Sequence, residues 1–108
     1  MGITTMKYTF IFLALIAIGN VMAQEQKHNY KPDAGYVPDG QTAIKIAVAV
    51  WEPIYGVEKI AKEKPFHGYL KNGVWYVNGS LPDGWLGGVA EAEIAKDDGR
   101  ILRISHGK

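Results

Sequence analysis

The sequence predicts an α+β fold, in which one kinked N-terminal helix and a second, short helix pack on a curved four-stranded antiparallel sheet of two hairpins. Three observations predict it. Apolar residues recur at helical steps of three and four in residues 41–54, they alternate in residues 66–81 and 89–106, and turn signals divide these two stretches. Helices followed by strands are typical of α+β domains rather than of parallel α/β sheets.

The first 23 residues have the pattern of a signal peptide. Lys7 precedes the apolar run 8–18, and Val21-Met22-Ala23 supplies small residues at the positions that a signal peptidase reads. A membrane-spanning helix needs about 20 apolar residues, so we expect cleavage after Ala23 and no stable membrane insertion. Met1 and Met6 are both possible starts. A periplasmic or secreted protein is therefore expected.

Residues 24–37 are polar and contain Pro32 and Gly35, so we interpret them as a flexible tether whose last residues begin to pack. Residues 38–108 form the folded domain. The full chain has 12 basic and 11 acidic side chains, and removal of residues 1–23 takes away only Lys7, which leaves 11 of each. This balance gives no general attraction to nucleic acid or to anionic lipid. The chain has no cysteine, so no disulfide stabilises the domain.

We expect the first helix to begin after Asp39, whose carboxylate can act as the N-cap. Because Pro53 has no N–H to donate, we expect this helix to kink or end near Glu52, with Gly56 closing it. Residues 57–64 then form the second helix. The buried face of the first helix carries the apolar residues at helical spacing, namely Ala43, Ile44, Ala47, Val48, Val50, Trp51 and Ile54.

The first hairpin joins residues 66–71 and 74–81 through Asn72-Gly73, a strong signal for a two-residue turn. This turn gives the pairs Lys71–Val74, Leu70–Trp75, Tyr69–Tyr76 and Gly68–Val77. The core face then carries Phe66, Leu70, Trp75, Val77 and Leu81. The opposite face, solvated but aromatic, carries His67, Tyr69, Lys71, Tyr76 and Asn78.

The second hairpin joins residues 89–96 and 100–106 around Asp97-Asp98-Gly99. A three-residue turn with a left-handed Gly99 and a bulge keeps the apolar residues on one face. It gives the pairs Ile94–Leu102, Ala92–Ile104 and Glu93–Arg103. Ala90 and Ala92 are small, which leaves room on the inner face for the helix that carries Trp51. The inner face so derived has no titratable residue, which argues against a small-molecule pocket.

No pattern of catalytic or metal-binding residues is found in the sequence. His28, His67 and His106 lack metal-ligand spacing and are expected to face solvent. Asp97 and Asp98 precede Gly99 in the predicted hairpin turn, where aspartates are common, so they need no catalytic explanation. Glu91 and Glu93 lie beside Arg103 on the outer face, where a cross-strand ion pair accounts for them. We therefore expect no catalytic residue, no cofactor, no metal and no enzymatic activity.

Exposed aromatic residues are the remaining candidates for function. Tyr and Trp are enriched at protein interfaces, so the candidate partner-binding residues are His67, Tyr69, Tyr76, Asn78 and Trp85. An alternative of equal weight is that Tyr69 and Tyr76 only stack across the strands and hold the hairpin together. Core packing is favoured for Trp51 and Trp75. We expect a monomer or a weak dimer.

Several short motifs, in order, resemble the small NTF2-fold immunity proteins of bacterial polymorphic toxin systems. They are Trp51-x-Pro53-Ile54-Tyr55-Gly56, Lys64-Pro65-Phe66, Gly73-x-Trp75-x-Val77-x-Gly79-x-Leu81-Pro82, Gly87-Gly88 and Asp98-Gly99-Arg100-Ile101-Leu102. The resemblance covers residues 38–108. It implies an NTF2-like or cystatin-like fold and an exported protein that binds and neutralises a cognate toxin.

A second resemblance implies another class of function. A helix followed by hairpins and ending in Asp98-Gly99-Arg100-Ile101-Leu102 is also similar to the PepSY domain. That resemblance implies a periplasmic inhibitory or regulatory module that binds a protease or an envelope protein.

Overall fold

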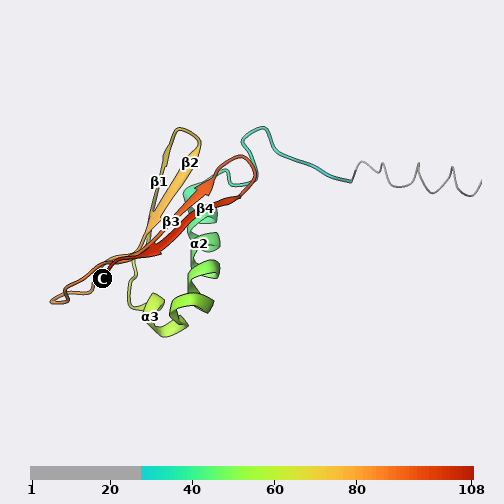
Figure 1. The fold of residues 1–108 in the computed structure, drawn as a ribbon. Helices are drawn as coiled ribbons and strands as arrows, with labels where there is room; N and C mark the ends of the chain where they lie inside the picture. Colours follow the sequence, from blue (N-terminus) through green and yellow to red (C-terminus); the bar gives the residue numbers. More distant parts are fainter. Residues whose placement is uncertain (1–27) are drawn as a thin grey trace, which may run out of the picture. The chain divides into compact units, whose positions relative to one another are not determined.

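The computed structural model describes residues 28–108, of which 31–108 form one compact unit (Figure 1). The predicted signal peptide, residues 1–23, and the start of the predicted tether lie outside the described residues. The elements of the unit are, in chain order, α2 (Gly40–Tyr55), α3 (Val57–Ala61), β1 (His67–Lys71), β2 (Val74–Asn78), β3 (Ala90–Ala95) and β4 (Ile101–His106).

The four strands form one antiparallel sheet in the order β1-β2-β3-β4. Helix α2 packs across β1, β2 and β3, and α3 packs against α2, so both helices lie on the same side of the sheet (Figure 1). This arrangement confirms the predicted α+β fold of helices on an open four-stranded sheet. The opposite face has no helical cover within residues 31–108.

Helix α2 begins where the sequence predicts and ends later than Glu52. The carboxylate of Asp39 accepts a hydrogen bond from the backbone N–H of Thr42 at 2.8 Å, which confirms the N-cap. The helix continues through Pro53 and ends at Tyr55, followed by Gly56 with φ 103°. Pro53 lies in the last turn and is exposed, so the loss of one helical hydrogen bond there does not stop the helix. Helix α3 is shorter than the predicted 57–64 and ends at Ala61.

The first hairpin has the predicted register, including Leu70 opposite Trp75 and Tyr69 opposite Tyr76. Both turn residues are left-handed, with φ 52° at Asn72 and 77° at Gly73, as a two-residue turn that matches the twist of the strands requires. The core face is only partly buried. Val77 and Trp75 are buried, but Leu70 on the edge strand is 44% exposed and Leu81 beyond the strand is 41% exposed.

The second hairpin confirms two predicted pairs and corrects the third. Glu93 faces Arg103 and Ala92 faces Ile104, but Ile94 faces Ile101 rather than Leu102. The turn is one residue longer than predicted, because the N–H of Ala95 donates to the carbonyl of Arg100 and closes a four-residue loop. The bulge next to Ile94 takes up the extra residue and restores the register farther along the strands. Leu102 is left 44% exposed.

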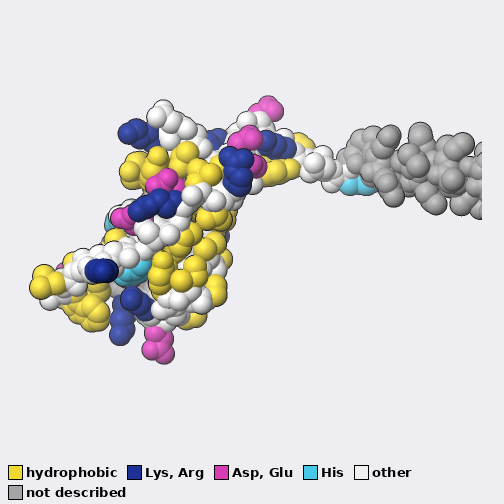
Figure 2. All heavy atoms as spheres, viewed as in Figure 1, with side chains coloured by type: hydrophobic (Ala, Val, Ile, Leu, Met, Phe, Trp, Pro, Cys, Tyr) yellow, Lys and Arg dark blue, Asp and Glu magenta, His cyan; other side chains and the backbone are white. Residues whose placement is uncertain are grey.

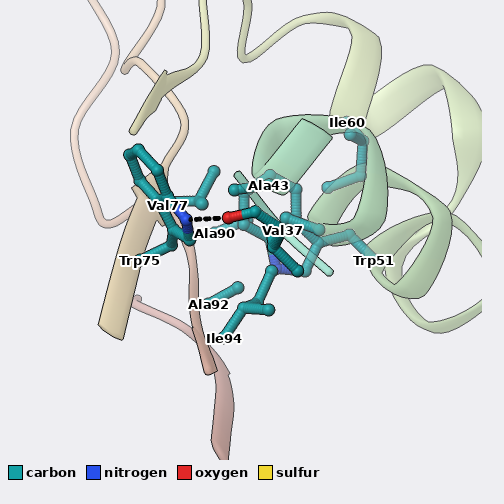
Figure 3. Packing of buried hydrophobic residues seen from close by; sticks show 10 residues of the cluster. Val37, Ala43, Trp51, Ile60, Trp75, Val77, Ala90, Ala92 and Ile94 are labelled. Atoms are coloured by element: carbon teal, nitrogen blue, oxygen red, sulfur yellow. Dashed lines mark hydrogen bonds between the residues drawn. The ribbon is translucent and has the colours of Figure 1, made fainter. Parts of the chain in front are cut away.

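The core lies between α2 and the sheet (Figure 3). Trp51 is fully buried and Trp75 is 8% exposed, which confirms both as core residues. Ala90 and Ala92 are also buried, and the indole N–H of Trp51 donates to the carbonyl of Glu91 at 3.1 Å. Small β3 residues thus let the bulky indole approach the strand, as the sequence predicts.

Residues 31–37, which we assigned to the tether, pack against the turn between β3 and β4. The N–H of Val37 donates to the carbonyl of Lys96, and its own carbonyl accepts from the indole N–H of Trp75 at 2.8 Å (Figure 3). Val37 is 1% exposed. Lys31 pairs with Asp97 in the same turn. The compact unit therefore starts before Pro38, the predicted first residue of the domain.

Candidate functional site

Tyr69 and Tyr76 stack on the face of the sheet that has no helical cover. Their ring centroids are 5.2 Å apart and their planes are inclined by 14°. They are directly opposite in the register of β1 and β2, which brings cross-strand side chains close together. Tyr69 remains 57% exposed. The pair is a flat aromatic surface held in place by its own stacking.

The other predicted residues of this face lie beside the tyrosines. His67 and Asn78 lie directly opposite each other, two residues along each strand from the tyrosines and on the same face. The Nε2 atom of His67, which is exposed as predicted, lies 3.2 Å from Ser80 Oγ. Tyr69, Tyr76 and Asn78 line a shallow depression of about 190 Å³ whose other wall comes from β3 and β4. Four of the five predicted residues therefore share one surface of the sheet.

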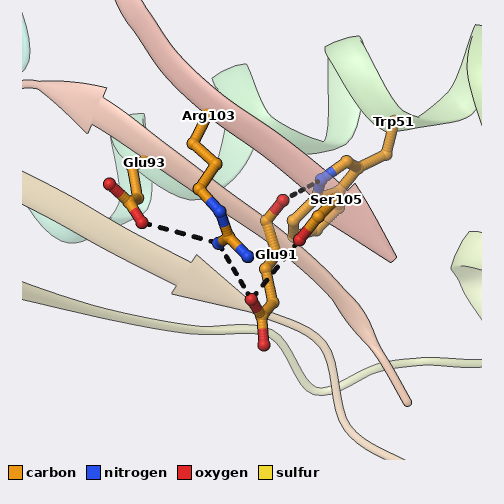
Figure 4. A network of polar contacts seen from close by, with 5 residues as sticks. All are labelled: Trp51, Glu91, Glu93, Arg103 and Ser105. Atoms are coloured by element: carbon orange, nitrogen blue, oxygen red, sulfur yellow. Dashed lines mark hydrogen bonds and ion pairs between the residues drawn. The ribbon is translucent and has the colours of Figure 1, made fainter. Parts of the chain in front are cut away.

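The far wall of this depression is a charged network centred on Arg103 (Figure 4). The Nη1 atom of Arg103 lies 3.0 Å from Glu91 Oε1 and 3.5 Å from Glu93 Oε2. The predicted cross-strand ion pair is thus confirmed. Hydrogen bonding to Glu91 is the largest cause that raises the pKa of Arg103 above its ordinary value, and the charges of both carboxylates add to it. The network fixes the orientation of three long side chains next to the tyrosines.

Trp85, the fifth predicted residue, belongs to a different surface. It lies in the connection between β2 and β3, is 57% exposed, and lines a groove that shares no residue with the tyrosine depression. The Nζ atom of Lys62 lies 5.8 Å from the centre of its ring, a cation–π distance. The structure therefore divides the predicted interface into two surfaces.

A buried ionisable pair forms the floor of that groove. Glu63 Oε2 lies 2.7 Å from His106 Nε2, and Glu63 Oε1 accepts a hydrogen bond from the N–H of Ala90 at 2.8 Å. The side chains are 6% and 12% exposed. The expectation that His106 faces solvent is wrong, and so is the expectation that no titratable residue borders the core.

The sequence analysis missed this pair, although the spacing of each residue from an apolar neighbour was a signal for it. Glu63 follows the buried Ile60 by three residues, and its N–H donates to the carbonyl of Ile60 as in a continued helical turn. It therefore lies on the helical face that is buried. His106 is two residues beyond Ile104 on β4, which places both on the inner side of the sheet. Gly79 makes room for the carboxylate, because a Cβ atom there would lie 2.6 Å from Glu63 Oε1.

The described residues show no cluster of three or more His, Cys, Asp or Glu side chains that could hold a metal ion. Among residues 28–108 no helix is both long enough and apolar enough to span a membrane.

The fold and the two surfaces define a small α+β domain with exposed aromatic and charged faces. Residues 42–108 match the family of NTF2 fold immunity proteins, and the chain belongs to this family. Of the two resemblances seen in the sequence, this match supports the first. Membership indicates an immunity role in general and favours a non-enzymatic role.

The chain is also similar to a curated protein of Escherichia coli (strain K12), the uncharacterized protein YhhH, with 37% identity over 67 residues. The match covers 61% of this chain and 53% of that protein, so the chain spans about half the length of this curated relative. No solved structure matches the chain.

Proposed function

We propose that this chain is an exported immunity protein that binds a cognate bacterial toxin and neutralises it by occupying the toxin's surface. The observation that carries the proposal is the family match over residues 42–108, since an immunity role requires specific recognition of another protein. The predicted signal peptide supports export to the periplasm or the cell exterior, where a toxin that crosses the envelope would be met.

The outer face of the sheet is the proposed contact surface. Tyr69 and Tyr76 are already stacked and half open to solvent, so binding orders few side-chain rotamers. The Arg103 network beside them satisfies its own charges, which lowers the cost of desolvating it against a partner. Aromatic contact area next to satisfied polar groups is the usual composition of a protein interface.

The test has two stages. The protein, expressed as the full chain with a C-terminal tag, is used to capture partners from lysate and envelope fractions of its native host, and mass spectrometry identifies them. The candidate toxin is then expressed in cells with and without this chain. Relief of growth arrest by this chain supports the proposal. A captured toxin whose activity is unchanged by this chain overturns it, and capture of a protease or an envelope sensor favours the PepSY-like alternative.

A further inference from the structure

The groove that contains Trp85 is a second surface with its own chemistry. It has a volume of about 530 Å³ and runs between the α3 region, the β2–β3 connection and the residues that follow β4. Figure 2 shows hydrophobic and basic side chains side by side at this end of the molecule, where the β2–β3 connection projects next to α3. Its shape and composition differ from those of the flat tyrosine surface.

One wall of the groove is apolar. Leu81, Trp85 and Leu86 line it and are 41%, 57% and 97% exposed. The side chain of Leu86 is almost entirely in solvent, so it contributes no hydrophobic burial to the fold of its own chain. Contiguous exposed apolar side chains that border a concave site are typical of a surface that another molecule covers.

The other wall is basic. Lys59, Lys62 and Lys108 line the groove, all are exposed, and none has a carboxylate within 4 Å among the described residues. By contrast, Arg103 on the sheet face is paired with carboxylates of this chain. Glu58 is the one exposed acidic side chain that lines the groove, because Glu63 is buried and bound to His106 and to the N–H of Ala90. The groove therefore has unpaired positive charge.

We propose that this groove binds an acidic segment of the toxin, whose carboxylates pair with Lys59, Lys62 and Lys108 and whose apolar side chains cover Trp85 and Leu86. The inference rests on the proposed function and specifies the chemistry of the partner. Charge complementarity argues for an acidic occupant. A protein segment is favoured over nucleic acid or membrane for three reasons. The groove is lined by only three lysines, the formal net charge of the whole chain is +1, and one of the two walls is apolar.

Binding of two model peptides to the purified protein, expressed as the full chain, tests the charge preference. The probes are fluorescein-labelled (Glu-Leu)3-Glu and the matched (Lys-Leu)3-Lys, and fluorescence polarisation gives the dissociation constants. The acidic peptide is expected to bind and the basic peptide is not. Equal binding of both peptides, or no binding of the acidic one, overturns the proposal.

Two charge-reversal variants locate the binding. Lys59→Glu with Lys62→Glu should weaken acidic-peptide binding by about tenfold or more, since two lysine contacts become repulsive. Lys45→Glu with Lys71→Glu changes the net charge equally at exposed lysines outside the groove and should leave binding unchanged. Equal weakening in both variants would show that net charge alone attracts the peptide. Trp85→Ala should also weaken binding, because it removes the apolar contact.

Further probes separate this inference from the proposed function. A 20-base-pair DNA duplex or phosphatidylglycerol vesicles that bind more tightly than the peptide, and lose binding in Lys59→Glu with Lys62→Glu, would overturn the acidic-segment proposal. If the peptide does not bind but the protein still captures the toxin and protects cells from it, the acidic-segment proposal is rejected and the immunity proposal stands. Groove-dependent peptide binding by a protein that does not protect cells would reject the immunity proposal alone.

Discussion

Glu63 Oε2 and His106 Nε2 lie 2.7 Å apart, and this buried contact joins the segment after α3 to the end of β4. Two residues that are 43 positions apart in the chain therefore close one end of the core. The same carboxylate accepts the N–H of Ala90, at the start of β3, and the ring of His106 lies 5.1 Å from that of Tyr55 in α2. The Glu63–His106 pair thus connects the segment after α3 with α2, β3 and β4.

Glu63→Ala should lower the free energy of unfolding by about 3–5 kcal/mol, the usual loss when one partner of a buried pair is removed. It leaves the N–H of Ala90 and the ring of His106 without their acceptor. Glu63→Gln keeps a side-chain oxygen for the Ala90 N–H and should lose less. Urea unfolding followed by circular dichroism measures both variants. If the two lose equal stability, the hydrogen bond to Ala90 contributes nothing.

Trp75→Ala should lower the free energy of unfolding by about 3–5 kcal/mol, as expected for truncation of a buried aromatic residue. The change also removes the hydrogen bond to the carbonyl of Val37 and so frees residues 31–37. Amide hydrogen exchange should show faster exchange at the N–H of Val37, which donates to Lys96. A well-folded Trp75→Ala variant with native exchange rates would be incompatible with the core described above.

Tyr69→Ala combined with Tyr76→Ala should weaken toxin binding while the protein stays folded. The stacked pair contributes up to about 1 kcal/mol to the hairpin, which is small beside the stability of an ordinary domain. Calorimetric titration with the captured toxin measures binding, and circular dichroism monitors the fold. Lys45→Ala, at an exposed lysine of α2 outside this face, is the control. Full binding by the folded double variant would exclude this face as the interface and leave only the hairpin-stacking role for the tyrosines.

Asp39 makes stability depend on pH at the acidic end of the range. The N–H of Thr42 lowers the pKa of Asp39 below its ordinary value of 3.8. A carboxylate whose pKa is lower in the folded state than in the unfolded state stabilises the fold at a pH above its unfolded-state pKa. This stabilisation is lost as the pH falls through the folded-state pKa. Asp39→Asn keeps an N-cap acceptor but has no such titration. The difference in melting temperature between wild type and Asp39→Asn should therefore shrink as the pH falls from 5 to below 3.8. A difference that stays constant over this range would contradict the assignment.

The sequence by itself determined the elements and their local geometry. Helical spacing, the Asp39 cap and the Asn72-Gly73 turn depend on residues only a few positions apart, so the sequence alone is enough to predict them. The same holds for the first hairpin register, because a two-residue turn fixes every pair that follows it. The stacked tyrosines follow directly from that register. The position of Glu91 and Glu93 beside Arg103 follows from the alternation of side chains along the strands of the second hairpin.

Only the tertiary structure decided how distant segments meet. The four-residue turn and the bulge near Ile94 give the same faces as the predicted three-residue turn farther along the strands, so alternation alone does not distinguish them. The docking of residues 31–37 depends on the hydrogen bond from the indole N–H of Trp75 to the carbonyl of Val37. The burial of His106 depends on the position of Glu63 in the folded domain. The separation of Trp85 from the tyrosines depends on the position of the β2–β3 connection. These contacts form between segments whose sequence patterns are independent, and the free energy of packing, rather than local preference, selects them.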